Sequence, residues 1–146
     1  MNSKIIGIEC SLSTSDFNFD QWMRGIPLEQ YQLYAQALML NCMKSDCIIN
    51  RILTLSELEE LIRTYGIMEI CLSIFPKNEV PHAIPNPSHF LKSASLCSLI
   101  YYDAGRLELY IKPTDWLEIV VQNLKQCNPE AISYKLAGQD TRESFL

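Results

Sequence analysis

The segment DAGRLELYIKPTDWLEIVVQNLK, residues 103–125, contains the clearest change of hydrophobic period in this chain. Before Pro113 apolar and polar residues alternate, as in a strand with one buried face, and after it apolar residues recur at three- and four-residue steps, as in an amphipathic helix. The strand residues that share one face are Leu107, Leu109 and Ile111. The helix residues that share one face are Leu117, Val120, Val121 and Leu124. We expect the turn at Pro113 to fold the helix back onto the strand and bury both sets together.

Similar patterns elsewhere give an alternating order of strands and helices. Strands are expected at residues 4–12, 67–75, 96–102, 107–111 and 131–136, with a short edge strand at 47–50. Helices are expected at residues 27–40, 55–65 and 114–124, and a short one begins at Pro87 after Asn86 as N-cap. This order predicts a single α+β domain over residues 1–146, with one mixed, mainly antiparallel sheet and helices packed mainly on one face. A split β-α-β arrangement is expected in its C-terminal half.

Two of these helices depend on particular local patterns. In residues 27–40 the apolar positions recur at helical spacing and include Leu28, Tyr31, Tyr34, Ala35 and Leu38. That spacing predicts an amphipathic helix. In the next helix, Thr54 and Glu57 have the spacing of a capping box, and Gly66 is expected to end the helix.

The composition of the 146-residue chain excludes some kinds of partner. Seventeen acidic residues against twelve basic ones leave a net charge of −5 and no basic cluster, which disfavours nucleic-acid binding. No apolar run approaches the ~20 residues that a membrane-spanning helix needs. Glu9 interrupts the only apolar stretch near the start that resembles a signal peptide. We therefore expect a cytoplasmic protein that binds neither nucleic acid nor a membrane.

The cysteines and histidines do not form a recognisable metal or redox motif. Without a secretion signal, the six cysteines are expected to be reduced and structural. The only histidines, His82 and His89, are seven residues apart and lack the ligand spacing of a zinc site. Cys42 and Cys47 are too far apart for a CxxC redox motif. The sequence therefore predicts no metal and no cofactor.

Residues 58–146 resemble an uncharacterised Firmicutes family known only as a domain of unknown function. The matching segments, in order, are Phe75-Pro76, Phe90-Leu-Lys-Ser93, Glu108-Leu-Tyr-Ile111, Tyr134 and Asp140-Thr-Arg142. The segment 27–40 has no counterpart in that family, and the ending Phe145-Leu146 differs from its aromatic ending. The resemblance implies a fold and a Gram-positive bacterial origin, and it implies no activity or catalytic residue.

Two hypotheses about function follow from the residues. The N-terminal region combines aromatic residues with acidic ones, a composition that suits a protein-binding surface as well as a helix packed in the core, and the core interpretation is favoured. The candidate binding residues are Phe17, Phe19, Trp22, Tyr31, Asp103 and Arg142. The first hypothesis is a non-enzymatic module that binds a basic partner protein, of the antitoxin, immunity or phage-accessory type. The alternative is a small-metabolite enzyme that uses the proline-rich loop at residues 76–87 and the C-terminal strands, where Asp103, Glu108, Asp140 and Glu143 offer carboxylates.

Replacing Thr54 by alanine tests the predicted capping box. The variant Thr54→Ala loses the hydroxyl that accepts a hydrogen bond from an otherwise unpaired helix amide. We expect its free energy of unfolding to fall by about 1 kcal/mol. Urea denaturation followed by circular dichroism measures this difference, and an unchanged midpoint would show that Thr54 does not cap the helix.

Overall fold

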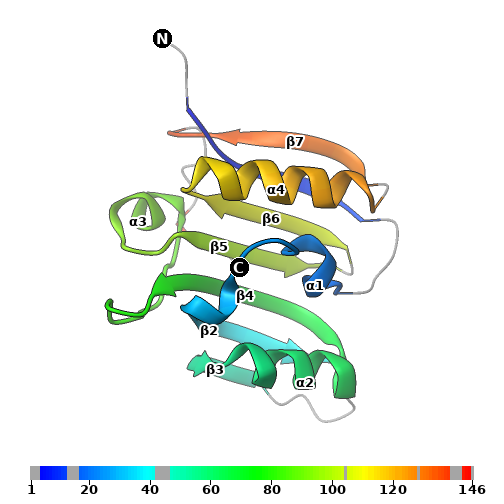
Figure 1. Ribbon diagram of the computed structural model, residues 1–146, viewed down its shortest axis with the longest axis vertical. Helices are drawn as coiled ribbons and strands as arrows, with labels where there is room; N and C mark the ends of the chain where they lie inside the picture. The colour runs from blue at the N-terminus through cyan, green and yellow to red at the C-terminus, as the bar shows by residue number, and fades with distance from the viewer. Residues whose placement is uncertain are drawn as a thin grey trace.

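A computed structural model describes residues 4–12, 17–41, 47–103, 105–127, 129–138 and 143–145. Seven strands in these residues form one sheet in the order β3-β2-β4-β5-β6-β1-β7 (Figure 1). The strands are β1 Ile5–Ser11, β2 Tyr31–Leu40, β3 Cys47–Leu53, β4 Ile67–Pro76, β5 Cys97–Tyr102, β6 Arg106–Ile111 and β7 Glu130–Leu136. The helices are α1 Phe19–Trp22, α2 Leu55–Tyr65, α3 Pro87–Lys92 and α4 Thr114–Lys125, with a 3-10 turn η1 at Leu28–Gln30.

The expected α+β class is confirmed, and the pairing is more uniform than a mixed sheet. Each pair of neighbouring strands is antiparallel. The split β-α-β arrangement is also present, because α4 connects β6 to β7 across the intervening β1. A second such unit, which the sequence analysis did not predict, connects β3 to β4 through α2 across β2. The antiparallel pairing of β4 with β5 and of β5 with β6 links the two units.

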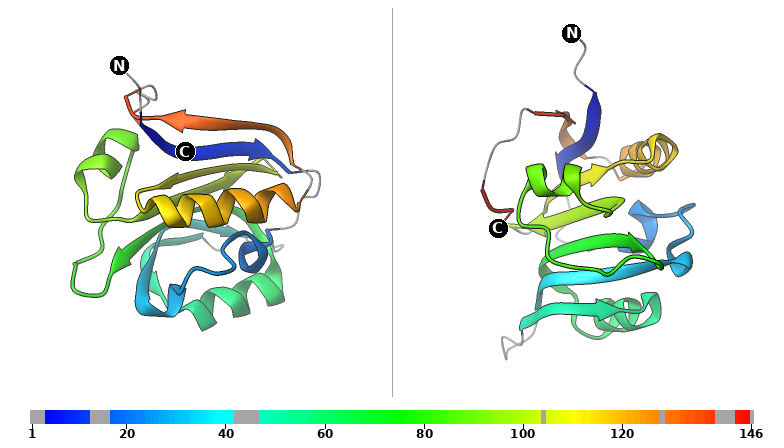
Figure 2. Two further views of the ribbon diagram at one scale, coloured as in Figure 1. Left: turned by 45° about the horizontal axis from the view of Figure 1, so that its top comes forward. Right: turned by 90° about the vertical axis from the view of Figure 1, so that its left-hand side faces the viewer.

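The helices lie mainly on one face of the sheet, as expected. Helices α1, α2 and α4 cover one face, whereas α3 lies on the opposite face (Figure 2). The first face, which we call the helical face, carries the larger hydrophobic core. The opposite face carries a smaller core formed by Ile6, Cys71, Phe75, Ile84, Phe90, Ile100, Tyr110 and Phe145. The central strands β4, β5 and β6 are therefore buried on both sides.

The predicted helix at residues 27–40 is wrong, because most of this segment is the ten-residue strand β2. Its pairing with β4 contains one extra residue between Ala35 and Ala37, which is a β-bulge. The bulge shifts the side-chain alternation by one position, so the buried residues are Leu33, Ala35, Leu38 and Leu40. The three-residue step from Ala35 to Leu38 at the bulge matches a helical step, and Tyr34, which the helix prediction placed on the same face, packs instead against Phe75 on the opposite face of the sheet.

A bulge also changes the expected faces of β1. Strict alternation along the strand predicted at residues 4–12 would place Ile6, Ile8 and Cys10 on one face, but Ile6 packs in the smaller core and the other two pack in the larger one. The cause is an extra residue of β1 between Ile5 and Gly7 in the pairing with β7. The edge strand expected at 47–50 is present and continues to Leu53.

The local signals at helix ends are confirmed. Thr54 and Glu57 form both hydrogen bonds of the capping box, each 3.0 Å long. These bonds and the neighbouring Arg51 lower the pKa of Glu57. Asn86 caps α3 by accepting a hydrogen bond from the amide of His89. The helix after Pro113 folds back as predicted, and the two apolar sets of residues 103–125 lie in the larger core.

The described cysteines occupy several environments. Cys10, Cys71 and Cys97 are buried, Cys127 is partly buried and Cys47 is exposed. Burial raises the pKa of Cys10 to about 11 and that of Cys97 to about 12. A thiol with such a pKa stays protonated at neutral pH and is a poor nucleophile. Cys42, which the sequence analysis paired with Cys47, lies outside the described residues.

Gly7 lies where β1 and β6 approach most closely. A Cβ atom at this position would lie 2.0 Å from the carbonyl oxygen of Leu109 and 3.2 Å from the Cα of Tyr110. Both are backbone atoms, so no side-chain rotation relieves the clash. Any residue larger than glycine forces the two strands apart.

We expect Gly7→Ala to lower the free energy of unfolding by about 2 kcal/mol, because the added methyl group overpacks a rigid backbone contact. Gly138→Ala is the matched control, since a Cβ there meets no atom within 4 Å and carries only the strain of a φ of +82°. Parallel urea denaturation of the two variants separates steric from conformational cost. Equal or smaller destabilisation of Gly7→Ala would contradict the close approach of β1 and β6.

Candidate functional site

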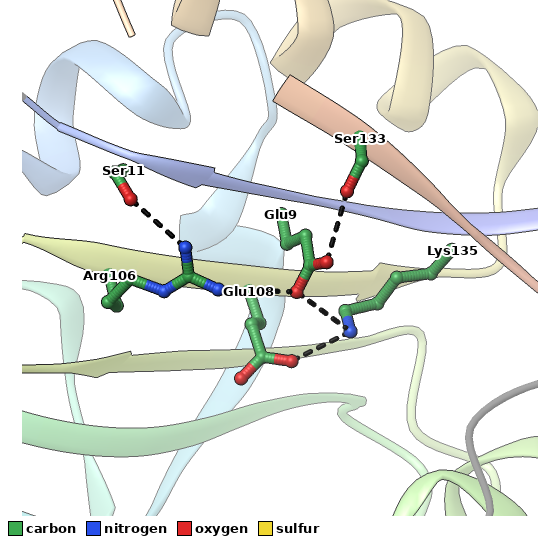
Figure 3. A network of polar contacts seen from close by, with 6 residues as sticks. All are labelled: Glu9, Ser11, Arg106, Glu108, Ser133 and Lys135. Carbon is green, nitrogen blue, oxygen red and sulfur yellow. Dashed lines mark hydrogen bonds and ion pairs between the residues drawn. The ribbon is translucent and has the colours of Figure 1, made fainter. Parts of the chain in front are cut away.

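A network of charged and hydroxyl side chains crosses the face of the sheet opposite the helical face, over strands β1, β6 and β7 (Figure 3). Its members in the figure are Glu9, Ser11, Arg106, Glu108, Ser133 and Lys135. The sequence analysis had singled out Glu108 as a possible acid-base carboxylate. Its side chain is only 2% exposed, so this face of β6 is covered.

Strand register brings these residues together. Glu9 of β1 lies directly opposite Glu108 of β6 and Ser133 of β7. Like charges in directly opposed positions repel each other and destabilise a sheet unless a cation lies between them. Lys135 supplies that cation, because it pairs in register with Gly7, one row away from the two carboxylates. Since Gly7 has no side chain, the Lys135 stem can cross β1 and reach β6.

The distances show one ammonium group shared by two carboxylates. Lys135 Nζ lies 2.7 Å from Glu108 Oε1 and 3.4 Å from Glu9 Oε2. The same ammonium lies 5.1 Å from the centre of the Tyr110 ring, within the range of a cation-π contact. Arg106 approaches the outer side of Glu9, with Nη2 3.7 Å from Oε2.

Two serine hydroxyls complete the outer part of the network. Ser133 Oγ donates a hydrogen bond of 3.0 Å to Glu9 Oε1. Arg106 Nη1 donates one of 3.0 Å to Ser11 Oγ. Each bond joins two neighbouring strands, so the network ties β6, β1 and β7 together on this face.

The electrostatics favour the charged forms of both cations. Burial by itself lowers the pKa of Lys135, but the hydrogen bonds and charges of Glu108 and Tyr110 outweigh it and raise the pKa overall. A hydrogen bond with Tyr102 is the main cause that raises the pKa of Arg106, and the nearby carboxylates add to it. Burial, followed by the proximity of Glu108, raises the pKa of Tyr102. Because the pKa of Lys135 is raised in the folded state, its stabilising charge is present at neutral pH and is lost only as the solution becomes strongly alkaline.

The network is suited to holding strands together more than to catalysis. Two carboxylates face two cations, so the formal charges of Glu9, Glu108, Arg106 and Lys135 cancel. A general acid or base at neutral pH needs a pKa near 7, and the ammonium of Lys135 is shifted away from that value. We therefore interpret the network as a structural connection between β1, β6 and β7.

Most of the aromatic residues proposed from sequence lie in the core. Phe17, Phe19 and Trp22 are at most 5% exposed. The Phe17 ring packs edge-on against Trp22 and lies 5.2 Å from the Tyr101 ring. Tyr31 is partly buried and packs edge-on against Trp116 of α4. These side chains stabilise the helical face and do not form an exposed aromatic surface.

The other sequence candidates are scattered. Asp103 is exposed in the β5–β6 turn, where its φ of 49° is left-handed. Arg142 and Asp140 lie outside the described residues, and Glu143 is exposed.

The two histidines are held separately. His82 Nδ1 bonds to the carbonyl of Ala83, and its ring packs 5.4 Å from that of Phe75. His89 bonds to Asn86 through its amide and its ring nitrogen. Within the described ranges, no three His, Cys, Asp or Glu residues are grouped so that they could hold a metal ion.

The outer strand β3 has features that the sequence analysis missed. Among the described residues β3 pairs only with β2, so its other edge is open. Ile49 is 65% exposed and Ile52 is 50% exposed. In the sheet register they lie opposite Ala37 and Tyr34 of β2. Asn50 has a left-handed φ of 52°, which breaks the side-chain alternation of β3, so both isoleucines lie on the face opposite the helical face, beside these two residues of the smaller core. A run such as Cys-Ile-Ile-Asn-Arg-Ile-Leu indicates a strand, but exposure of its isoleucines could be found only in the folded protein.

Two grooves flank β3. One, on the helical face, has a volume of about 380 Å³ and is lined by Arg51, Leu53, Glu57, Glu60 and Leu61. A smaller one of about 110 Å³ lies over the β2–β3 pair and includes Ala37, Met39, Ile49 and Glu69. Between residues 47 and 69 the sequence has four glutamates and two arginines, so the surroundings of β3 carry excess negative charge.

The opposite edge of the sheet is less suited to pairing. Strand β7 has two register irregularities in its pairing with β1, and Ala131 has a φ of 52°. Its Lys135 side chain points over the sheet into the charge network. Bulges and inward-pointing charges are features that keep edge strands from pairing with other chains. Strand β3 also has one irregular residue, Asn50, but its register with β2 shows no shift, so of the two edges it is the one more open to a further strand.

Comparison of the chain with family models, curated proteins and solved structures gives no match. The resemblance of residues 58–146 to a Firmicutes family stays a prediction. In the described part of the chain, no helix has both the length and the apolar character needed to cross a bilayer.

The burial of Glu108 in the charge network generates a prediction about stability. Glu108→Gln keeps the shape of the side chain but leaves the ammonium of Lys135 buried with one fewer negative partner. Removing one member of a buried ion pair destabilises a protein by about 3 to 5 kcal/mol, and we expect a loss near the lower limit because the amide still accepts a hydrogen bond. Urea denaturation measures this loss in the free energy of unfolding.

Glu130→Gln is the control, because Glu130 lies exposed on β7, the strand that carries Lys135. It should change the free energy of unfolding by less than about 0.5 kcal/mol. The double variant Glu108→Gln with Lys135→Met should recover part of the loss, since it removes both charges. If the single variant at position 108 is as stable as the control, the network does not stabilise the fold.

Proposed function

We propose that this protein is a small non-enzymatic binding module that receives an extended, basic segment of a partner protein along the open edge of β3. The observation that carries the proposal is the combination of an edge that pairs with no further strand of the described residues, exposed apolar side chains and acidic surroundings. An added strand would pair through its backbone with β3, as in other cases of β-strand addition. A cytoplasmic location and a bacterial origin are parts of the same proposal.

The two faces of β3 define what the added strand should look like. Side chains of a strand alternate between faces, so every second partner residue would lie beside Ile49 and Ile52. These positions favour apolar residues such as valine or isoleucine. The remaining partner residues would lie on the helical face, beside the groove that includes Glu57 and Glu60. Glu57 and Glu60 already pair with Arg51 and Arg63, so a partner lysine or arginine would share their carboxylates, and the excess negative charge of residues 47–69 favours such a basic residue.

The enzyme alternative gains no comparable support. It used the proline-rich loop and the C-terminal strands, but the structure holds His82 and His89 in separate local contacts and leaves Asp103 exposed in a turn. The buried carboxylate of Glu108 is paired with Lys135. We therefore propose binding through β3 as the function.

A synthetic peptide tests the proposal directly. The probe is a fluorescently labelled seven-residue peptide that alternates valine and lysine, and its binding is measured by fluorescence anisotropy. We expect binding that falls roughly tenfold in Ile49→Ser, since a buried apolar contact of this size contributes more than 1 kcal/mol. Hydrogen exchange should show added protection of the backbone at residues 47–53.

Val80→Ser is the matched control, because Val80 is 83% exposed in a loop outside the sheet. It should bind the peptide like the unchanged protein. A peptide with glutamate in place of lysine should bind much more weakly. Equal binding of both peptides, or protection at β7 instead of β3, would refute the proposal.

A further inference from the structure

An open groove of about 560 Å³ lies between α4, the start of β1 and strand β7, on the helical face. Its volume is within the range of small-molecule sites, roughly 300 to 1,000 Å³. The groove is on the far side of the sheet order from β3, so it is independent of the proposed partner site. Figure 1 shows α4 lying over the strands at that end of the sheet, beside β7.

The groove exists because α4 does not cover the last strand. The helix buries Trp116, Val120 and Leu124 in the larger core. Its next side lines the groove with Leu117, which is partly buried, and with Val121, which is also a core residue and is 8% exposed. Tyr134 of β7 pairs in register with the fully buried Ile8, yet it remains 47% exposed. An apolar strip on the core side of the sheet is thus left open.

The floor of this strip is aliphatic. Ile5, Ile111, Leu117 and Val121 contribute its branched side chains, and Ile5 is 42% exposed. These side chains come from β1, β6 and α4, and the helix spans about 18 Å at 1.5 Å per residue. An elongated hydrocarbon chain fits such a surface better than a compact polar metabolite.

The charges around the groove are opposite to those of the whole protein. The chain carries a net charge of −5, but Lys4, Lys112 and Lys125 line the groove against a single Glu118. The ammonium of Lys112 donates to the carbonyl of Ser93 and lies over the Phe90 ring, so it points away from the groove. Lys4 and Lys125 are therefore the cations available at its rim.

One end of the groove is better suited to an anionic group than the other. Gly7 pairs with Tyr110, which places Lys4 and Lys112 at the same end of the sheet. Thr114, the first residue of α4, lines that same end. The positive end of a helix dipole and Lys4 favour an anion there, although Asp115 in the first turn of α4 and Glu118 in the lining offset part of this attraction. At the other end Lys125 lies beside the negative end of the helix.

We propose that this groove binds a free medium-chain aliphatic carboxylate. The hydrocarbon chain lies along Ile5, Ile111, Leu117 and Val121, and the carboxylate lies near Lys4 and the first turn of α4. The aliphatic floor selects the chain, and the local positive charge selects an anionic head group over a neutral or cationic one.

Isothermal titration calorimetry of the full chain with decanoate tests the proposal. We expect saturable binding, and octanoate should bind roughly tenfold more weakly, because each buried methylene contributes about 0.8 kcal/mol. Decanol and decyltrimethylammonium should bind much more weakly than decanoate. Equal binding of decanol, or no dependence on chain length, would overturn the proposal.

Variants locate the site. Lys4→Glu and Ile5→Asp alter exposed positions. The first removes a charge contact and the second an apolar contact, so each should weaken decanoate binding roughly tenfold. The matched controls Lys77→Glu and Val80→Asp make the same changes on an exposed loop and should leave binding unchanged. Unaltered binding in the first pair would overturn the assignment. Binding only to anionic lipid vesicles, and not to free decanoate, would overturn it in favour of a membrane surface.

Discussion

The close approach of β1 to β6 at Gly7 is the constraint on which the rest of the structure depends. A side chain at this position would overlap the backbone of Leu109, so the two strands can pair only through glycine. Once β1 lies against β6, it forms the surface on which β7 pairs, and α4 connects β6 to β7 across it. The same missing side chain lets Lys135 cross β1 and reach Glu108. Backbone packing, topology and electrostatics at this end of the sheet thus share one cause.

The two ends of the sheet are built alike but are completed differently. Each consists of a strand inserted into a split β-α-β unit, with β1 inside one and β2 inside the other. At the β7 end, the charge network and two bulges occupy the edge. At the β3 end, exposed isoleucines border an open edge. An edge strand with unpaired backbone groups and apolar side chains tends to acquire a partner. This difference is why we propose the binding function at β3.

Sequence reasoning succeeded where the determinants were local. The capping box at Thr54, the proline-started helix after Asn86 and the turn at Pro113 each depend on a few neighbouring residues, and all are confirmed. It failed at residues 27–40, because a bulge in β2 changed a two-residue alternation into one that resembles a helix. Bulges depend on the register of neighbouring strands, which lie far away in the chain. The bulge in β1 likewise depends on its register with β7, so the sequence could not show that Ile6 packs on the opposite face from Ile8.

The sequence by itself determined the α+β class, the positions of most strands and helices, and the apolar faces that build the larger core, because hydrophobic period and capping act over short distances. Only the tertiary structure decided which faces are covered. Glu108 is polar and alternates away from the larger core, yet it is buried because side chains from other strands of the sheet, including Lys135 of β7, lie against it. Ile49 and Ile52 are apolar, yet they are exposed because β3 is last in the sheet. Burial depends on neighbours brought together by folding, and that information is not contained in any short segment.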